Sequence, residues 1–153
     1  MTQRRARVKK VVAIREKELD GRVQKLGEAR SQAARIEEER RHAADALARA
    51  AAERTALAQG SISAADWRDA NEWLASRERS HVVAGEAVKR AEAHVERSQH
   101  AVLTARTALK GVEMLDEKLH REELKDAEKA TRKLEDELAR ARATANAQDK
   151  RRG

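Results

Sequence analysis

The chain has 153 residues, of which 40% are charged and 1% are aromatic, and its formal net charge is +7. It contains no Phe, Tyr, Pro or Cys, which excludes a disulfide framework and leaves few large side chains for a globular core. A composition dominated by Ala, Glu, Lys, Leu and Arg is typical of coiled coils and long helices.

The high charge and low hydrophobicity would also suit a disordered chain. Long stretches of regular apolar spacing favour helices instead. No apolar run approaches the ~20 residues that cross a bilayer, and no apolar segment follows the basic N-terminus as it would in a secretory signal. The sequence therefore predicts an all-α protein of the cytoplasm.

The first expected element is a helix over about residues 3–58. Its apolar seam advances in steps of three and four residues, with one irregularity near Ala29 to Ala33, as a coiled coil requires. The basic residues Arg40 and Arg54 fall on this seam and can lay their stems along it. The seam consists of Leu19, Val23, Leu26, Ala29 or Arg30, Ala33, Ile36, Arg40, Ala43, Leu47, Ala50, Arg54 and Leu57.

The stretch 59–63 predicts a turn. Gly60 can adopt the left-handed backbone that ends a helix, because it has no Cβ. Ser63 can cap the next helix by accepting a hydrogen bond from a free N–H in its first turn. The other members of this signal are Asp66, at the capping-box position, and Ile62 and Trp67, at the two positions of a hydrophobic staple.

The second expected helix covers about residues 64–146 and is followed by a frayed basic tail over 147–153. In its middle part, steps of three and four alternate strictly along the seam, and beyond Val112 the register slips through Leu115 and Leu119. The seam before the slip consists of His81, Ala84, Val88, Ala91, Val95, Ser98, Val102, Ala105, Leu109 and Val112. After the slip it continues through Ala127, Ala130, Leu134 and Leu138.

Two long helices joined by a turn predict a single domain over residues 1–153, an antiparallel coiled-coil hairpin. At 1.5 Å per residue the first helix spans ~80 Å and the second ~120 Å. The first helix is expected to run out opposite about Leu115. The last thirty or so residues of the second helix would then be unpaired over ~45 Å. Such a segment must fray, pair with another copy or insert into a partner.

No catalytic pattern is present in the sequence. The five histidines lack metal-ligand spacing, and no glycine-rich phosphate loop occurs. His81 is interpreted as a partly buried seam residue. The expectation is a protein that is not an enzyme and has no cofactor, metal or small-molecule substrate. Nucleic acid is not an expected partner either, because acidic residues interrupt the basic ones and aromatic stacking platforms are absent.

Four segments resemble the FliJ/YscO family, the small stalk proteins of flagellar and virulence type III export machines. They are the run VVAIREKELD over 11–20, the break at 60–63 followed by a tryptophan, and the charged runs 115–122 and 128–139. The resemblance covers nearly the whole chain.

This resemblance implies a mechanism. Members form an antiparallel coiled coil similar to the central stalk of rotary ATPases. The end that carries the termini is thought to enter the pore of the hexameric export ATPase, and the other end to reach the export gate membrane protein. Members also handle export chaperones. The implied location is the cytoplasm, peripheral to the inner-membrane export apparatus.

Carried onto this sequence, the resemblance assigns residues to the two ends. The ATPase-end contacts are Arg4, Arg5, Arg7, Lys9, Lys10, Leu134 and Leu138. The gate-end contacts are Trp73, Arg77 and Ser80 on the second helix, and Glu38, His42, Asp45 and Arg49 on the first. The flagellar pattern has aromatic and apolar residues on the gate face, whereas the first helix offers charged ones here. This favours different contacts or the virulence-type branch.

Other functions stay open on the sequence alone. One is a generic structural coiled coil that oligomerises through its unpaired segment. Another is a stalk subunit of a rotary ATPase itself. A third is a basic coiled coil that binds nucleic acid, which would show steep salt dependence.

Overall fold

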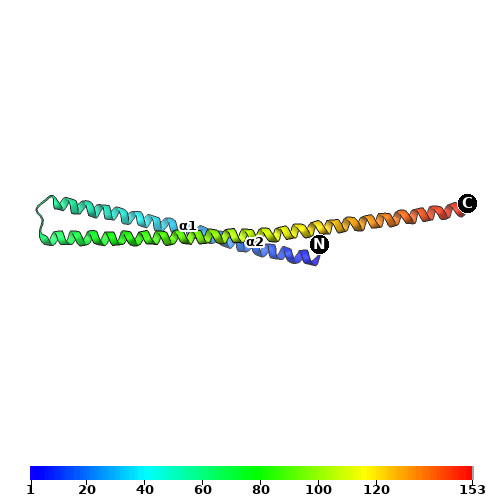
Figure 1. Ribbon diagram of the computed structural model, residues 1–153, viewed down its shortest axis with the longest axis horizontal. Coiled ribbons are helices and arrows are strands. Elements are labelled where there is room, and N and C mark those ends of the chain that lie inside the picture. The colour runs from blue at the N-terminus through cyan, green and yellow to red at the C-terminus, as the bar shows by residue number, and fades with distance from the viewer. Residues whose placement is uncertain (153) are drawn as a thin grey trace. The chain divides into compact units, whose positions relative to one another are not determined.

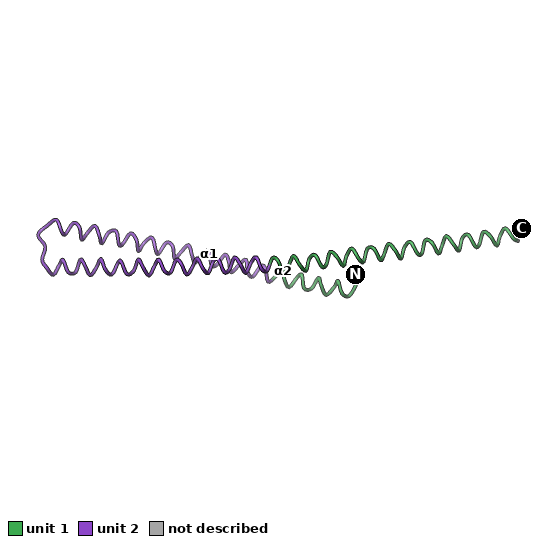
Figure 2. Tube along the Cα trace, viewed as in Figure 1, with its two compact units in different colours: residues 1–17, 106–153 green, residues 18–105 purple. Residues whose placement is uncertain are grey.

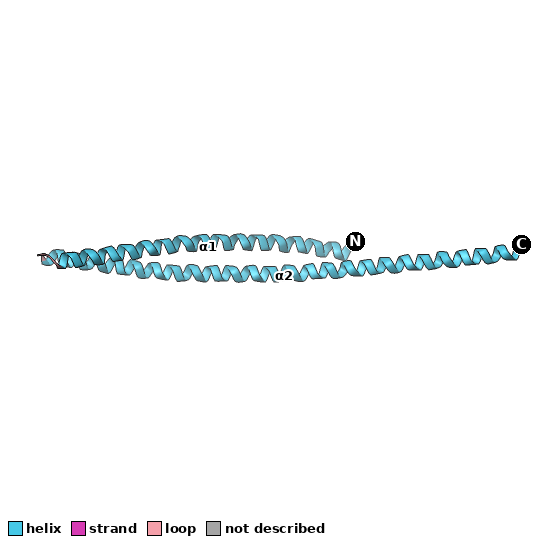
Figure 3. Cartoon of the chain, turned by 90° about the horizontal axis from the view of Figure 1, so that it is seen from above, coloured by secondary structure: helices cyan, strands magenta, loops and turns pink. Residues whose placement is uncertain are grey.

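The computed structural model describes residues 1–152, and they form two long helices. Helix α1 covers Gln3–Ala58 and helix α2 covers Ala64–Arg152 (Figure 1). Among the described residues there is no strand (Figure 3). The predicted all-α class, two helices in an antiparallel hairpin, is thereby confirmed.

The chain divides into two compact units (Figure 2). Unit 1 combines residues 1–17 with residues 106–153, and unit 2 covers residues 18–105. Each unit therefore contains a part of both helices. That the whole chain acts as one coiled-coil domain stays a prediction.

Unit 2 is held together by small side chains. Its buried residues are Ala29 and Ala50 of α1 and Ala91 and Val102 of α2. Alanine lets two helices approach closely, but burying its methyl group stabilises less than the ~1.5–3 kcal/mol of a leucine or valine. The irregular point of the predicted seam is thereby resolved, since Ala29 is buried and Arg30 is exposed.

The rest of the predicted seam of unit 2 is mostly half-buried, as the spacing predicted. Val23 and Leu57 are the more open positions of α1, at 45% and 42% exposure. The guanidinium of Arg40 donates two hydrogen bonds to Glu37, at 2.9 and 2.7 Å. These bonds lower the pKa of the Glu37 carboxyl.

Helix α1 does not end in the way that the glycine suggested. No described glycine has a positive φ, so the left-handed conformation predicted for Gly60 is wrong. Instead the N–H groups of Gln59 and Gly60 donate to the carbonyls of Ala56 and Leu57, both at 3.3 Å. The last turn therefore tightens to i→i−3 bonds, which satisfy the free carbonyls without a left-handed residue.

Helix α2 begins with a side-chain cap. The Ser63 hydroxyl oxygen accepts a hydrogen bond from the N–H of Asp66 at 3.0 Å, and its O–H donates to the Asp66 carboxylate at 2.6 Å. The N–H of Trp67 donates to the Ser63 carbonyl at 3.1 Å. Ile62 and Trp67 are both half-buried, and the Arg54 guanidinium lies 5.0 Å from the centre of the Trp67 ring.

We expect Ser63→Ala to lower the free energy of unfolding by about 1 kcal/mol, because the N–H of Asp66 loses its acceptor. Ser61→Ala is the matched control, since Ser61 is exposed in the same turn. Urea unfolding followed by circular dichroism measures both variants. An equal effect of the two substitutions would show that the hydroxyl of Ser63 does not cap α2.

Helix α2 also extends further than the spacing suggested. It was expected to end near Asn146 and to fray over 147–153, yet it continues to Arg152. The run 139–152 contains neither glycine nor proline and is rich in Ala and Arg, which are strong helix formers. Residue 153 lies outside the described residues.

Candidate functional site

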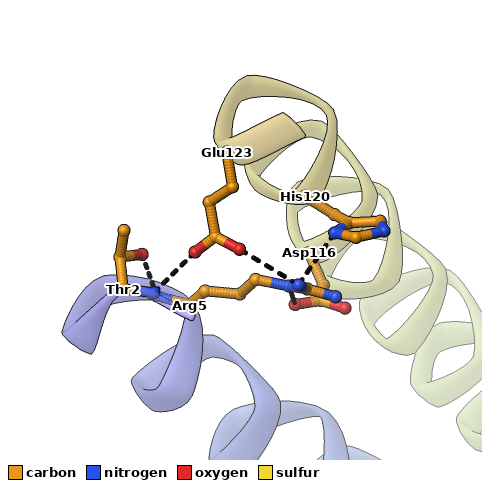
Figure 4. Close-up of polar contacts among 5 residues, drawn as sticks. All are labelled: Thr2, Arg5, Asp116, His120 and Glu123. Carbon is orange, nitrogen blue, oxygen red and sulfur yellow. Dashed lines mark hydrogen bonds and ion pairs between the residues drawn. The ribbon is translucent and has the colours of Figure 1, made fainter. Parts of the chain in front are cut away.

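A polar cluster joins the two helices of unit 1. We call it the terminal cluster, and it consists of Thr2, Arg5, Asp116, His120 and Glu123 (Figure 4). Arg5 donates from Nε to Asp116 at 3.0 Å and from Nη1 to Glu123 at 3.1 Å. The backbone N–H of Thr2 donates to the other oxygen of Glu123 at 2.6 Å. Arg5 Nη1 also lies 2.9 Å from Nδ1 of His120. A guanidinium can only donate, so this contact is a hydrogen bond when Nδ1 of His120 is the acceptor.

The register of α2 explains why two carboxylates face α1. Val112, Asp116, Leu119 and Glu123 are spaced by four, three and four residues, so they share one face of the helix. The side chains of Asp116 and Glu123 are 21% and 19% exposed, and that of Arg5 is 14% exposed. On this face α2 therefore carries two carboxylates where a seam usually carries apolar groups, and Arg5 of α1 packs against them.

The terminal cluster differs from the prediction in two ways. The seam was predicted through Leu115, but Leu115 is 40% exposed and its neighbour Asp116 faces α1. The start of α1 was expected opposite Leu115, whereas Thr2 lies against Glu123, about two helical turns further along α2. A search for apolar residues at seam spacing misses this register. Charged residues at the same spacing would have indicated it.

The hydrogen bonds of the cluster hold Glu123 in its charged form. The backbone N–H of Thr2 contributes most, followed by the Thr2 side chain and Arg5, and partial burial opposes them. Together they lower the pKa of Glu123 from its ordinary value of 4.5 to about 2. The pKa of Arg5 is raised, chiefly by its hydrogen bond to Asp116.

The lowered pKa predicts a pH dependence of folding. Glu123 binds its proton more weakly in the folded chain than in the unfolded one. Its contribution to stability is therefore complete above about pH 5 and is lost as the pH falls towards 2. We expect Glu123→Gln to destabilise the chain at pH 7 and to have a shrinking effect below pH 4. Thermal melting of both proteins across this range measures the difference.

Glu122→Gln is the control for this titration, because Glu122 is exposed and adjacent in sequence. It should melt like the wild type at every pH. A Glu123→Gln effect that stayed constant down to pH 2 would contradict the assigned role of the carboxylate.

Beyond Glu123 every described side chain of α2 is exposed, from Leu124 to Arg151. We call residues 124–151 the C-terminal extension. Two of the predicted ATPase-end residues lie on it, Leu134 at 61% exposure and Leu138 at 56%. The basic members of the predicted set that are exposed in α1 are Arg4, Arg7, Lys9 and Lys10. Arg5 differs from them, because its guanidinium forms ion pairs within the terminal cluster.

The predicted gate-end residues lie in unit 2. Trp73 is 49% exposed, and the guanidinium of Arg77 lies 3.9 Å from the centre of its ring. Ser80 is exposed and donates its hydroxyl to the carbonyl of Ser76. The predicted residues on α1 are all exposed, and they are Glu38, His42, Asp45 and Arg49.

Local contacts hold the gate-end residues on each helix. His42 lies 3.5 Å from Glu38, an ion pair when the imidazole is protonated. Arg77 is half-buried, whereas Trp73 presents much of its ring to solvent. No hydrogen bond or ion pair joins the α1 group to the α2 group in the part of the chain that the structure describes. The structure thus brings Trp73 and Arg77 together but does not link the two groups.

Three further observations concern the kind of site that the described residues offer. They contain no group of three or more His, Cys, Asp or Glu side chains arranged to hold a metal ion. His81 is half-buried in the seam, and its Nδ1 is buried without a hydrogen-bond partner. None of the described helices combines the length and apolarity needed to cross a membrane.

The chain matches the model of a known protein family. The family model described as "Flagellar FliJ protein" matches residues 4–148, which is nearly the whole chain. No curated protein and no solved structure matches the chain significantly. The matched range includes the terminal cluster residues Arg5 to Glu123 and most of the C-terminal extension.

Proposed function

Since the chain belongs to the FliJ family, we propose that it links the hexameric export ATPase to the export gate membrane protein of a type III protein export apparatus. Family membership makes the chain a non-enzymatic stalk component related to flagellar protein export. The proposal adds the two ends of the link and export chaperones as further partners. It places the protein in the cytoplasm, peripheral to the inner-membrane export apparatus.

The C-terminal extension is the observation that carries the proposal. It is a regular helix whose side chains are all exposed, and it includes Leu134 and Leu138. Apolar side chains at helical spacing gain free energy when a partner removes them from water. We assign this segment, with the exposed basic residues Arg4, Arg7, Lys9 and Lys10, to the ATPase end. Arg5 belongs to the same end, where it holds the start of α1 against α2.

The exposed tryptophan of unit 2 supports the assignment of the gate end. Tryptophan and arginine are over-represented among the residues that carry most of the energy of protein interfaces. Trp73, stacked against Arg77, offers both in one place. Ser80 and the exposed polar group on α1, namely Glu38, His42, Asp45 and Arg49, complete the proposed gate contacts.

The ATPase end is tested by the rate of ATP hydrolysis of the cognate export ATPase. We expect the full chain to raise this rate or to promote the hexamer, and the double variant Leu134→Ala with Leu138→Ala to lose most of the effect. Both leucines are exposed, so the fold should be unchanged. The control is Val82→Ala with Val83→Ala, two valines of unit 2 that are each 64% exposed. A chain that leaves the rate and the hexamer unaffected would contradict the proposal.

A further inference from the structure

The C-terminal extension carries a coiled-coil seam that no described residue covers. Its steps alternate between three and four residues over three heptads, and every position is exposed. Leucines at 51%, 61% and 56% exposure supply its largest apolar groups. The seam consists of Leu124, Ala127, Thr131, Leu134, Leu138, Ala141 and Ala145.

Of the six positions beside this seam, three are acidic, one is basic and two are uncharged. Glu128 and Glu135 follow seam residues on one side, and Glu137 precedes one on the other, next to Leu138. Arg142 is the basic residue among these flanking positions. The other basic residues between 124 and 145 lie on the opposite face of the helix, at Lys125, Lys129, Arg132, Lys133 and Arg140.

Among the described residues, no ion pair neutralises the acidic flanks. One ion pair is formed among the described residues of this segment. It joins Lys129 to Asp126 at 3.8 Å, on the face away from the seam. Glu128, Glu135 and Glu137 form no such pair. Charges at these flanking positions select the partner helix of a coiled coil, because they lie across from the flanks of the partner.

We propose that this acidic-flanked seam docks an amphipathic helix of a partner protein whose own apolar seam is flanked by lysine and arginine. A second copy of the chain fits less well. In an antiparallel pair centred between Leu134 and Leu138, Glu135 and Glu137 would each lie beside their own counterparts, and like charges at these positions are unfavourable. In a parallel pair Glu137 would meet Arg142 of the other copy, but Glu128 and Glu135 would face no basic residue. A basic-flanked helix instead pairs with these glutamates while its apolar residues cover Leu124, Leu134 and Leu138.

This inference deepens the proposed function, on which it rests, because Leu134 and Leu138 belong to the proposed ATPase end. It gives the chemistry of the partner segment that would meet them there. The two proposals can fail separately, since docking of a helix is measured without any ATPase. Peptide binding without stimulation of the ATPase would sink the proposed function alone.

The test uses two fluorescent peptides and the full chain. Both peptides are three-heptad helices with leucine at every seam position, and they differ in carrying lysine or glutamate at every flanking position. Fluorescence anisotropy measures their dissociation constants. We expect the lysine peptide to bind at least about tenfold more tightly, with an affinity that falls as salt is added, because several exposed charge pairs act together.

Charge-reversal variants locate the peptide. Glu128→Lys with Glu135→Lys should weaken binding of the lysine peptide and strengthen binding of the glutamate peptide. Asp126→Lys with Asp136→Lys makes the same change of net charge on the opposite face and should have a much smaller effect. Leu134→Ala with Leu138→Ala should weaken binding of both peptides.

Several results would overturn the inference. They are equal binding of the two peptides, binding of neither, or an equal effect of the two charge-reversal pairs. Sedimentation equilibrium can give one more result that would overturn the inference. If the wild-type chain self-associates and Leu134→Ala with Leu138→Ala abolishes this, a second copy is the occupant of the seam.

Discussion

Replacing Gly21, Gly27, Gly85 and Gly111 together by alanine is expected to raise the free energy of unfolding by about 2–4 kcal/mol. All four lie inside helices, where glycine is less favourable than alanine by ~0.5–1 kcal/mol. A Cβ at each position meets no atom within 4 Å. The sites are well separated along the helices, so their effects should add.

Thermal and urea unfolding followed by circular dichroism measure this gain. Gly60→Ala is the matched control, because Gly60 lies in the turn between the helices. Its φ is not positive, and a Cβ there meets only the Leu57 carbonyl at 4.0 Å, so we expect little change. A fourfold variant no more stable than wild type would show that some of these glycines serve a contact absent from the chain alone.

The second large effect is expected at Leu119. Among the described residues of unit 1, Leu119 is the one apolar residue that is buried, at 6% exposure. Leu119→Ala should cost about 2 kcal/mol, at the lower end for leucine to alanine, because water can fill the gap in so thin a structure. Amide hydrogen exchange should then rise over residues 3–17, which pack against this part of α2.

Leu124→Ala separates burial from residue type. Leu124 is 51% exposed, only five residues further along the same helix, so its loss should change stability by less than about 0.5 kcal/mol. Equal destabilisation by the two substitutions would contradict the packing described for unit 1.

Much of the fold could be predicted because local signals and periodicity agree. The spacing of the seam in unit 2 places half-buried residues correctly, and the hydroxyl of Ser63 meets the N–H of Asp66 as its position suggests. The end of α1 could not be predicted in the same way. Gly60 permits a left-handed residue but does not require one, and the i→i−3 bonds of Gln59 and Gly60 were an equally satisfactory ending.

The terminal cluster could not be predicted from the spacing of apolar residues, for a physical reason. Its contacts depend on the register of two distant segments, and in that register charge pairs lie beside the buried Leu119. Asp116 competes with its apolar neighbour Leu115 for the position that faces α1. The guanidinium of Arg5 favours the register in which Asp116 faces α1, because it can bind Asp116 and Glu123 at once.

The same argument applies to the proposed contacts. Trp73, Leu134 and Leu138 are exposed and can therefore contact a partner. Their exposure does not tell which protein that partner is. The family match supplies the export apparatus, and the residues supply two chemically different surfaces, an aromatic one in unit 2 and an acidic-flanked apolar one in unit 1.

The central claim is that the two surfaces serve two different partners, and one comparison tests it most directly. ATPase stimulation and binding to the cytoplasmic part of the export gate are measured in parallel for wild type, for Leu134→Ala with Leu138→Ala, and for Trp73→Ala. We expect the leucine variant to lose stimulation and keep gate binding, and the tryptophan variant to do the reverse. If both variants lose or keep the same activities, the chain does not link the ATPase to the gate through these surfaces.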